Sequence, residues 1–271
     1  MADTGTYLYA VTLDLDVPRL DVKGVANRPV RTITQAELVA YVSEVPLDQF
    51  GEEPLRRSME DLDWLGETAR GHHRVVAAVA EHTPTAPIRL VTVYSGDDQV
   101  RRLLDQRHDD FVQVLSQIAG RVEWGVKAYV HPTEDQPTPT AREPADRAAA
   151  RGPGGAGSSA AAGAGTAYLK RRQAGLRSRE DAWRDASEQA QRIHHALTAL
   201  AVASHLHRPQ DPQLSGRSDW MILNGAYLVD EPRSAEFAAA LDGLRGPGVD
   251  LQLTGPWAPY SFAELDAEAP R

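Results

Sequence analysis

Up to Val130, the chain alternates between short apolar runs typical of strands and apolar stripes at helical spacing. Tyr7 to Leu13 is apolar on both faces of an extended chain, which is typical of a central strand. The β-rich segments Arg31 to Ile33 and Leu38 to Val45 are separated by a few polar residues and predict a hairpin. Apolar residues at helical spacing then predict an amphipathic helix from about Glu60 to Glu81.

A strand, a helix and another strand follow in this order. Ile88 to Tyr94 is a short apolar strand, and an amphipathic helix begins near Asp97 and ends at Gly120. Val122 to Val130 alternates between apolar and polar residues, as a half-buried strand does. This order predicts a βαβ unit whose two strands are parallel and joined by a right-handed crossover. With the earlier strands it predicts an α+β domain over residues 1–131, a ferredoxin-like sandwich.

The next segment, residues 132–165, is rich in Pro, Gly and Ala and has almost no large apolar residue. Such a segment buries too little surface to offset the entropy of ordering, so we interpret it as a flexible linker or loop. Its GPGGAG stretch follows no predicted strand and has no Gly-Lys-Ser/Thr after it, which argues against a phosphate-binding loop.

Residues 166–271 predict a second, smaller α+β domain. A long helix from about Ala167 to Ser204 carries apolar residues spaced by seven, but its first half has only one filled row. The apolar run Trp220 to Val229 predicts a central strand, and a short helix begins near Ser234. A last strand, Val249 to Leu253, leads into the GPWAPYSF tail. Both halves thus finish as strand, helix, turn and strand, which suggests the hypothesis of a duplicated lobe.

Composition narrows the class of protein. The chain has 271 residues, a formal charge of −9 and no cysteine, so disulfides and thiolate metal sites are excluded. The acidic balance argues against a nucleic-acid binder, and no apolar run is long enough for a membrane span. The N-terminus lacks the basic start and apolar stretch of a signal peptide. We therefore expect a soluble cytoplasmic protein.

The residues offer little catalytic chemistry. No common hydrolase, metalloprotease or calcium-binding motif is present. His205 and His207 are spaced to share a metal on an extended chain, but two ligands are too few for zinc. We predict no catalytic residue, no metal site and no cofactor.

A basic cluster at the start of the long helix, from Lys170 to Arg184, opposes the helix dipole and is therefore not explained by helix stability. Salt bridges to nearby acidic residues such as Asp181, an acidic protein partner and nucleic acid remain as explanations.

Five segments in order resemble the GvpF/GvpL family of gas vesicle proteins: YLYAVT, EWGVKAYV, TAYLKRR, LNGAYLV and LTGPWAPYSF. The chain departs from the family pattern at Leu90-Val91, where the family has Phe-Gly, and at Ala258, where it has a second proline. The resemblance implies two α+β domains, the first ferredoxin-like, and no known catalytic activity. It also implies an accessory role in gas vesicle assembly, with contacts to the small hydrophobic shell protein and to other accessory components.

A chaperone for a hydrophobic shell protein needs apolar surface beside solubilising charge. The long helix and the aromatic tail are the candidates, and the expected partner-binding residues are Leu169, Lys170, Arg171, Arg172, Leu176, Trp257, Tyr260 and Phe262. Two prolines stiffen the tail, and we expect Trp257 to be buried as an anchor on the second lobe. The alternatives are a ligand-binding protein or enzyme that uses the cleft between lobes, and a regulatory nucleic-acid binder.

Overall fold

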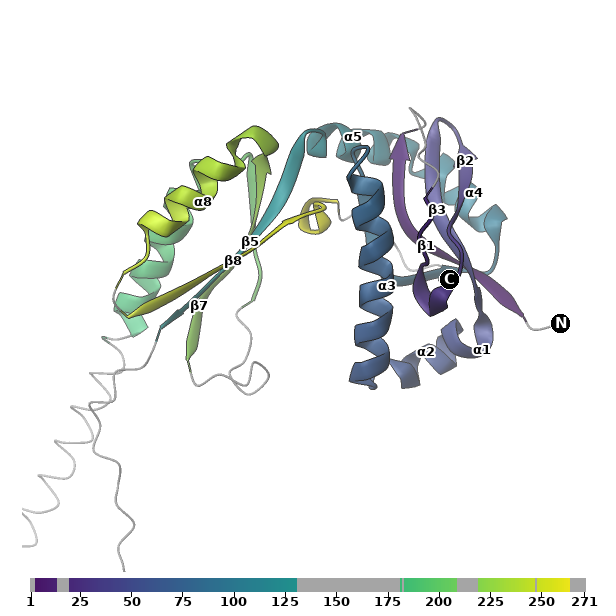
Figure 1. The fold of residues 1–271 in the computed structure, drawn as a ribbon, viewed down its shortest axis with the longest axis horizontal. Helices are drawn as coiled ribbons and strands as arrows, with labels where there is room; N and C mark the ends of the chain where they lie inside the picture. The colour runs from purple at the N-terminus through teal and green to yellow at the C-terminus, as the bar shows by residue number, and fades with distance from the viewer. Residues whose placement is uncertain are drawn as a thin grey trace, which may run out of the picture.

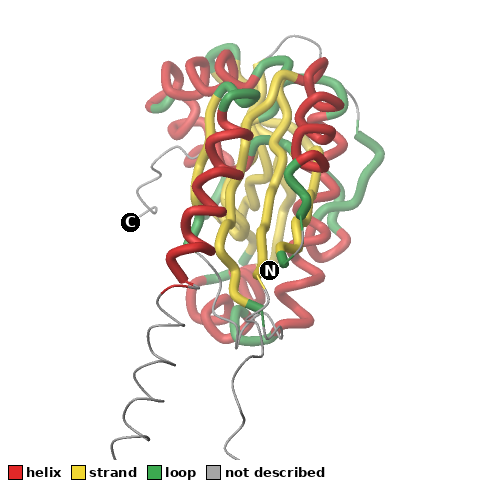
Figure 2. Tube along the Cα trace, turned by 90° about the vertical axis from the view of Figure 1, so that its left-hand side faces the viewer, coloured by secondary structure: helices red, strands yellow, loops and turns green. Residues whose placement is uncertain are grey.

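The computed structural model describes residues 3–13, 20–130, 181, 183–208, 219–246 and 248–263. These residues form two lobes that stand side by side, each built on a four-stranded antiparallel sheet (Figure 1). Helices flank the strands in a layered arrangement (Figure 2). The α+β class predicted from the sequence is confirmed. The predicted linker, residues 132–165, lies outside the described residues.

The first sheet has the strand order β2-β3-β1-β4. Strand β1 is central and buried on both faces, as its two-sided apolar pattern predicted. The hairpin between β2 and β3 is confirmed, and its two turn residues Ala36 and Glu37 have φ of 50° and 64°, as in a type I′ turn. The strands are β1 (Thr4–Leu13), β2 (Arg31–Gln35), β3 (Leu38–Pro46) and β4 (Ala86–Tyr94).

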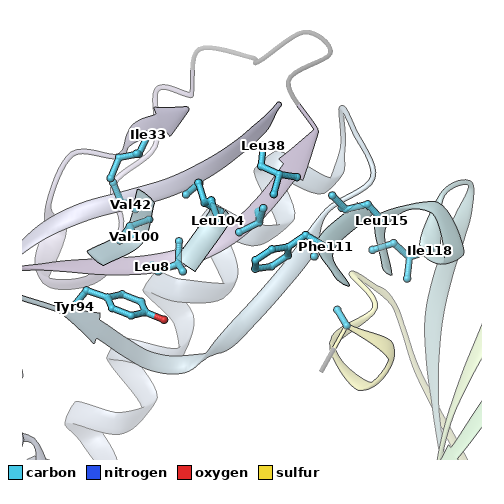
Figure 3. Packing of buried hydrophobic residues seen from close by; sticks show 14 residues of the cluster. Leu8, Ile33, Leu38, Val42, Tyr94, Val100, Leu104, Phe111, Leu115 and Ile118 are labelled. Atoms are coloured by element: carbon cyan, nitrogen blue, oxygen red, sulfur yellow. The ribbon is translucent and has the colours of Figure 1, made fainter. Parts of the chain in front are cut away.

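Helices cover both faces of this sheet. On one face, α3 packs against a core that includes Tyr7, Tyr9 and Val76; we call it the α3-side core. On the other, α4 and α5 pack against a core that includes Leu104 and Phe111, the α4/α5-side core (Figure 3). The helices are α1 (Leu47–Phe50), α2 (Glu52–Ser58), α3 (Leu62–Ala80), α4 (Asp97–Gln106) and α5 (His108–Ile118).

The helices in the structure differ from the predicted ones in two details. The Asp61 carboxylate caps α3 by accepting hydrogen bonds from the backbone N–H groups of Asp63 and Trp64, so α3 begins at Leu62. The single helix predicted from Asp97 to Gly120 is broken at Arg107, where φ is −112° and ψ is 18°. The break turns α5 so that Phe111 and Leu115 both reach the core.

The second sheet has the order β6-β7-β5-β8. The helix of residues 183–198 and α8 (Ser234–Gly243) pack against one face of it, around Ile193, Leu197, Tyr227, Phe237 and Leu241. The strands are β5 (Arg121–Val130), β6 (Ala203–Leu206), β7 (Trp220–Asp230) and β8 (Val249–Trp257). The described part of the long helix ends before Ser204, because residues 203–206 pair with β7 instead.

The predicted parallel pairing of β4 and β5 is wrong. Strand β5 belongs to the second sheet, where it pairs antiparallel with β7 and β8. The sheets therefore divide the chain before Arg121, whereas the sequence suggested a domain boundary at residue 131.

The ferredoxin-like detail predicted for residues 1–131 is not confirmed. The connection between β1 and β2 contains a short 3₁₀ helix, Val25–Asn27, among its described residues, and helices cover both faces of the sheet. The second lobe instead shows the order strand, helix, strand, strand, helix, strand that is typical of that fold. Both sheets share one strand order, so the duplication hypothesis now matches β1–β4 with β5–β8.

Candidate functional site

The predicted partner-binding residues fall into two groups. Leu169, Lys170, Arg171, Arg172 and Leu176 lie outside the described residues. Trp257, Tyr260 and Phe262 all belong to the stretch from Trp257 to Ala263, which we call the C-terminal segment. The candidate site is therefore built around this segment.

The C-terminal segment leaves the second sheet and forms a turn that lies between β8 and α3 in the view of Figure 1. Gly255 has a φ of 121°, and a Cβ there would lie 2.8 Å from the Glu123 carbonyl oxygen, so only glycine fits at this turn. After Pro259 the chain forms a short 3₁₀ helix, η3 (Tyr260–Phe262).

The side chains of the C-terminal segment divide between the two cores of the first lobe. Ala258 and Tyr260 pack against the α3-side core, and Phe262 and Ala263 against the α4/α5-side core. The predicted anchoring of this segment on the second lobe is wrong, because these side chains pack against the first lobe.

A buried carboxylate on β5 fixes the segment in place. Glu123 is 8% exposed, and its two carboxylate oxygens accept hydrogen bonds from the Ser261 backbone N–H at 2.7 Å and the Ser261 hydroxyl at 2.8 Å. Burial raises the pKa of Glu123, while the two bonds from Ser261 and the nearby His205 oppose the rise. Glu123 was not predicted from the sequence, because its partner Ser261 lies 138 residues later in the chain.

Glu123, Ser261 and His207 are the residue types of a hydrolase triad, but their bonds run in the wrong order. The Ser261 hydroxyl donates to Glu123, and the Nε2 atom of His207 lies 3.3 Å from the same hydroxyl. In a working triad the serine donates to the histidine, and the carboxylate orients the histidine. This arrangement holds the segment and does not activate Ser261.

Beneath the segment, Tyr260 joins a cluster of aromatic residues in the α3-side core. Its ring centroid lies 6.3 Å from that of His72. The Tyr7 hydroxyl accepts a hydrogen bond from the Val91 N–H at 3.0 Å and lies 3.0 Å from Nδ1 of His72. Burial raises the pKa of Tyr7 and of Tyr260, and burial lowers the pKa of His72 to about 4. All of these groups are therefore neutral at pH 7.

A groove between the lobes lies on one side of the C-terminal segment, with a volume of about 440 Å³. Trp257 lines it and is 41% exposed, so the predicted burial of this side chain is wrong. The indole meets the His73 ring of α3 edge to face at a centroid distance of 5.2 Å. The other residues that line the groove are both apolar and charged, and include Ala77, Arg121 and Pro259.

An apolar pocket of about 270 Å³ lies on the other side of the segment. It is bounded by β4, by the junction of α4 and α5, and by Tyr260, Ser261 and Ala263. Strand β4 bulges here, because residues 88–91 face the single β1 residue Tyr9.

Val91 in this bulge has a φ of 63°, which is unusual for a β-branched residue. The resemblance described above implies glycine at this position, where a positive φ costs little.

Other candidate chemistry is sparse in the described part of the chain. His205 and His207 lie at β6 with ring centroids 4.8 Å apart, and the described residues contain no group of three metal-ligating side chains. Arg184 pairs with Asp181 at 2.8 Å, in line with the salt-bridge interpretation of the basic cluster. Among the described helices, none has the length and apolarity needed to cross a membrane.

Comparison with known proteins gives consistent matches along the whole chain. The sequence model of the family described as gas vesicle synthesis protein GvpL/GvpF matches residues 5–264. Gas vesicle protein L of Streptomyces sp. (strain CB03234) is 42% identical over 268 residues, covering 97% of this chain and 94% of the relative. Gas vesicle protein F of the same strain is 30% identical over 265 residues, covering 96% and 99%.

Solved structures share the fold. The crystal structure of the gas vesicle protein GvpF from Anabaena sp. PCC7120 matches with a TM-score of 0.66 at 16% identity and covers 99% of both chains. That of GvpF from Microcystis aeruginosa matches with a TM-score of 0.64 at 18% identity, covering 96% of this chain and 99% of the other.

Proposed function

Since this chain belongs to the GvpL/GvpF family of gas vesicle synthesis proteins, we propose that it is a non-catalytic accessory protein that binds the hydrophobic shell protein during vesicle assembly. Family membership supports the accessory role in gas vesicle formation. The finer proposal is that the chain acts in the cytoplasm, at or near the growing vesicle, and also contacts other accessory components.

The exposed Trp257 is the observation that carries the proposed contact. It projects from a backbone held by Pro256 and Pro259, and Glu123 fixes the following residues through Ser261. An aromatic side chain that is already held in place loses little entropy on binding, and tryptophan is enriched among the residues that dominate interface energies. The neighbouring groove offers space for a partner's apolar side chain beside the indole.

The test is co-expression of the tagged chain with a gas vesicle shell protein, followed by measurement of the shell protein that copurifies. We expect Trp257→Ala to lower the copurified amount about tenfold, since loss of a central aromatic contact costs about 1.4 kcal/mol or more. Leu62→Ala is the control, because Leu62 is 80% exposed at the start of α3 and does not line the groove beside Trp257.

Circular dichroism and the melting temperature show whether each variant is folded. A folded Trp257→Ala variant that retains the shell protein as well as the unaltered chain does would remove Trp257 from the contact. If the unaltered chain itself retains no shell protein, the proposed binding function is wrong.

A further inference from the structure

Two glutamates line the groove beside Trp257, and each comes from a different lobe. Glu81 follows the last turn of α3, and Glu231 follows β7 in the second lobe. We propose that this groove binds a basic side chain of the partner, an arginine that lies next to an apolar residue. This inference rests on the proposed function and deepens it, because it names the chemistry of the partner segment that contacts Trp257.

The groove carries an excess of negative charge. Glu81 and Glu231 are both exposed, and neither has an ion-pair partner in the part of the chain that the structure describes. Arg121 also lines the groove, but its guanidinium group is held by the Asp230 carboxylate at 3.0 Å. Because Asp230 already balances Arg121, the charges of the two glutamates are left for a cation that comes from outside the chain.

Helix stability does not explain the position of Glu81. Its backbone N–H closes α3 by donating to the Ala77 carbonyl, a role that any residue except proline can fill. Its carboxylate lies at the C-terminal end of α3, where the helix dipole disfavours negative charge, and the last turn has no basic residue to offset this. Residues that break a local rule of stability are found mainly at functional sites.

Trp257 provides the second feature that an arginine recognises. The indole is 41% exposed and contacts the His73 ring edge to face. A guanidinium or ammonium group is attracted to an aromatic face within about 6 Å, and tryptophan attracts it most strongly. A guanidinium group stacks on such a ring and also donates two parallel hydrogen bonds to a carboxylate. An arginine therefore matches both the indole and the glutamates, whereas an apolar side chain matches only the indole.

The apolar part of the lining explains why an apolar residue lies next to the arginine. Ala77 and Ala80 of α3 and Ile118 of α5 line the same groove. The methylene groups of an arginine side chain pack on such a surface while its charged end stays in contact with water and carboxylates. An apolar cavity of about 150 Å³ holds a benzene-sized group, so a groove of about 440 Å³ has room for the arginine and for its neighbour.

The first test extends the copurification of the shell protein to Glu81→Gln, Glu231→Gln and the double variant. We expect each single substitution to lower the retained amount about twofold to fivefold, since exposed ion pairs contribute modestly, and the double variant to lower it about tenfold. Salt screens exposed charges, so raising the salt concentration from about 50 mM to about 500 mM should narrow the difference between the unaltered chain and the double variant.

The second test does not depend on the shell protein. A short fluorescein-labelled peptide, with one central Arg-Leu pair between alanines, is titrated with the full chain and its fluorescence anisotropy is measured. We expect the affinity to fall about tenfold when citrulline, which is similar in shape but uncharged, replaces the arginine. The double variant and Trp257→Ala should each weaken binding of the arginine peptide by a similar factor.

Two matched controls remove an exposed carboxylate that does not line the groove. Glu67→Gln alters α3, and Glu188→Gln alters the helix of the second lobe. Both variants should retain the shell protein and bind the peptide as the unaltered chain does. Glu81→Gln should melt at no lower temperature than the unaltered chain, because the substitution removes a charge that opposes the dipole of α3. Loss of binding by this variant is therefore not an effect of unfolding.

Several results would overturn the inference. One is a shell protein that the unaltered chain and the folded double variant retain equally, and another is equal affinity for the arginine and citrulline peptides. An arginine peptide that does not bind would also overturn it. Self-association of the chain that the double variant abolishes would assign the groove to a second copy.

Failure of the proposed function gives a different result. If the chain binds the arginine peptide through Glu81 and Glu231 but retains no shell protein, the chemistry assigned to the groove stands and its assignment to the shell protein does not. If the shell protein is retained through Trp257 but without any effect of the two glutamates, the proposed function stands and this inference is wrong.

Discussion

Acidification should destabilise the first lobe through one buried histidine, His72. This side chain is 2% exposed and neutral, and burial, partly offset by the Ile88 carbonyl, lowers its pKa from 6.5 to about 4. The Tyr7 hydroxyl accepts a hydrogen bond from the Val91 N–H and lies 3.0 Å from Nδ1 of His72, where the direction of the bond depends on the histidine tautomer. Protonation of His72 would place a charge among buried aromatic rings.

The sign and size of the effect follow from the two pKa values. Between pH 6.5 and 4 the unfolded chain binds a proton at His72 that the folded chain does not, so stability falls as the pH falls through this range. At pH 5 the loss is about 2 kcal/mol, and it approaches about 3 kcal/mol below pH 4, since one pKa unit corresponds to about 1.4 kcal/mol. Above pH 6.5 this histidine has no effect on the pH dependence.

The assay is urea denaturation followed by circular dichroism at pH 7.5 and pH 5 for the unaltered chain and for His72→Gln. Carboxylates titrate in both proteins, so the difference between them isolates His72. We expect the difference between the free energies of unfolding of the two proteins to decrease by about 2 kcal/mol between pH 7.5 and pH 5. His82→Gln is the control, because His82 is exposed at the end of α3. A difference between the unaltered chain and His72→Gln that stays constant with pH would refute the reasoning.

Two further substitutions test the packing of the first lobe. Ser261→Ala removes one charge-assisted hydrogen bond to Glu123 and should lower the free energy of unfolding by about 1–2 kcal/mol in urea, whereas Ser116→Ala on the exposed face of α5 should not; equal stabilities would show that the bond contributes nothing. Gly24→Ala places a Cβ 2.0 Å from the Tyr9 hydroxyl oxygen and should cost about 2 kcal/mol or more, seen as a lower melting temperature. Gly243→Ala, with no atom within 4 Å, is its control, and equal effects of the two would contradict the predicted clash.

The sequence predicted the helices and strands themselves better than it predicted which strands pair with one another. Periodicity depends on neighbouring residues, so it identified β1, the β2–β3 hairpin, α3 and β7 with nearly the observed limits. It assigned β5 to the wrong sheet because the alternation in Val122–Val130 shows that one face is more buried, and not which strand lies beside it. The true neighbours, β7 and β8, follow only after the long segment that begins at residue 131.

The candidate site was predicted in part for the same reason. The GPWAPYSF motif was singled out from the sequence, and its role in binding a partner stays a prediction; its aromatic residues were expected on the second lobe, whereas Tyr260 and Phe262 pack against the first. Whether Trp257 or Tyr260 is buried depends on which lobe the chain crosses to after Gly255, and that is decided by Glu123, more than a hundred residues earlier. The apolar pocket combines β4, two helices and the C-terminal segment, so no single stretch of sequence announces it.

The C-terminal segment also sets an order of events during synthesis. Tyr260 and Ala263 belong to the packing of the first lobe, yet the ribosome adds them after every strand of the second lobe. Domains usually fold as units while the chain emerges, N-terminal part first. The first lobe therefore lacks the contacts of Tyr260 and Ala263 until translation has passed residue 263. Until then, the apolar surface beside β4 that this segment covers stays exposed in the nascent chain. The first lobe can pack fully only after the strands of the second lobe have been synthesised.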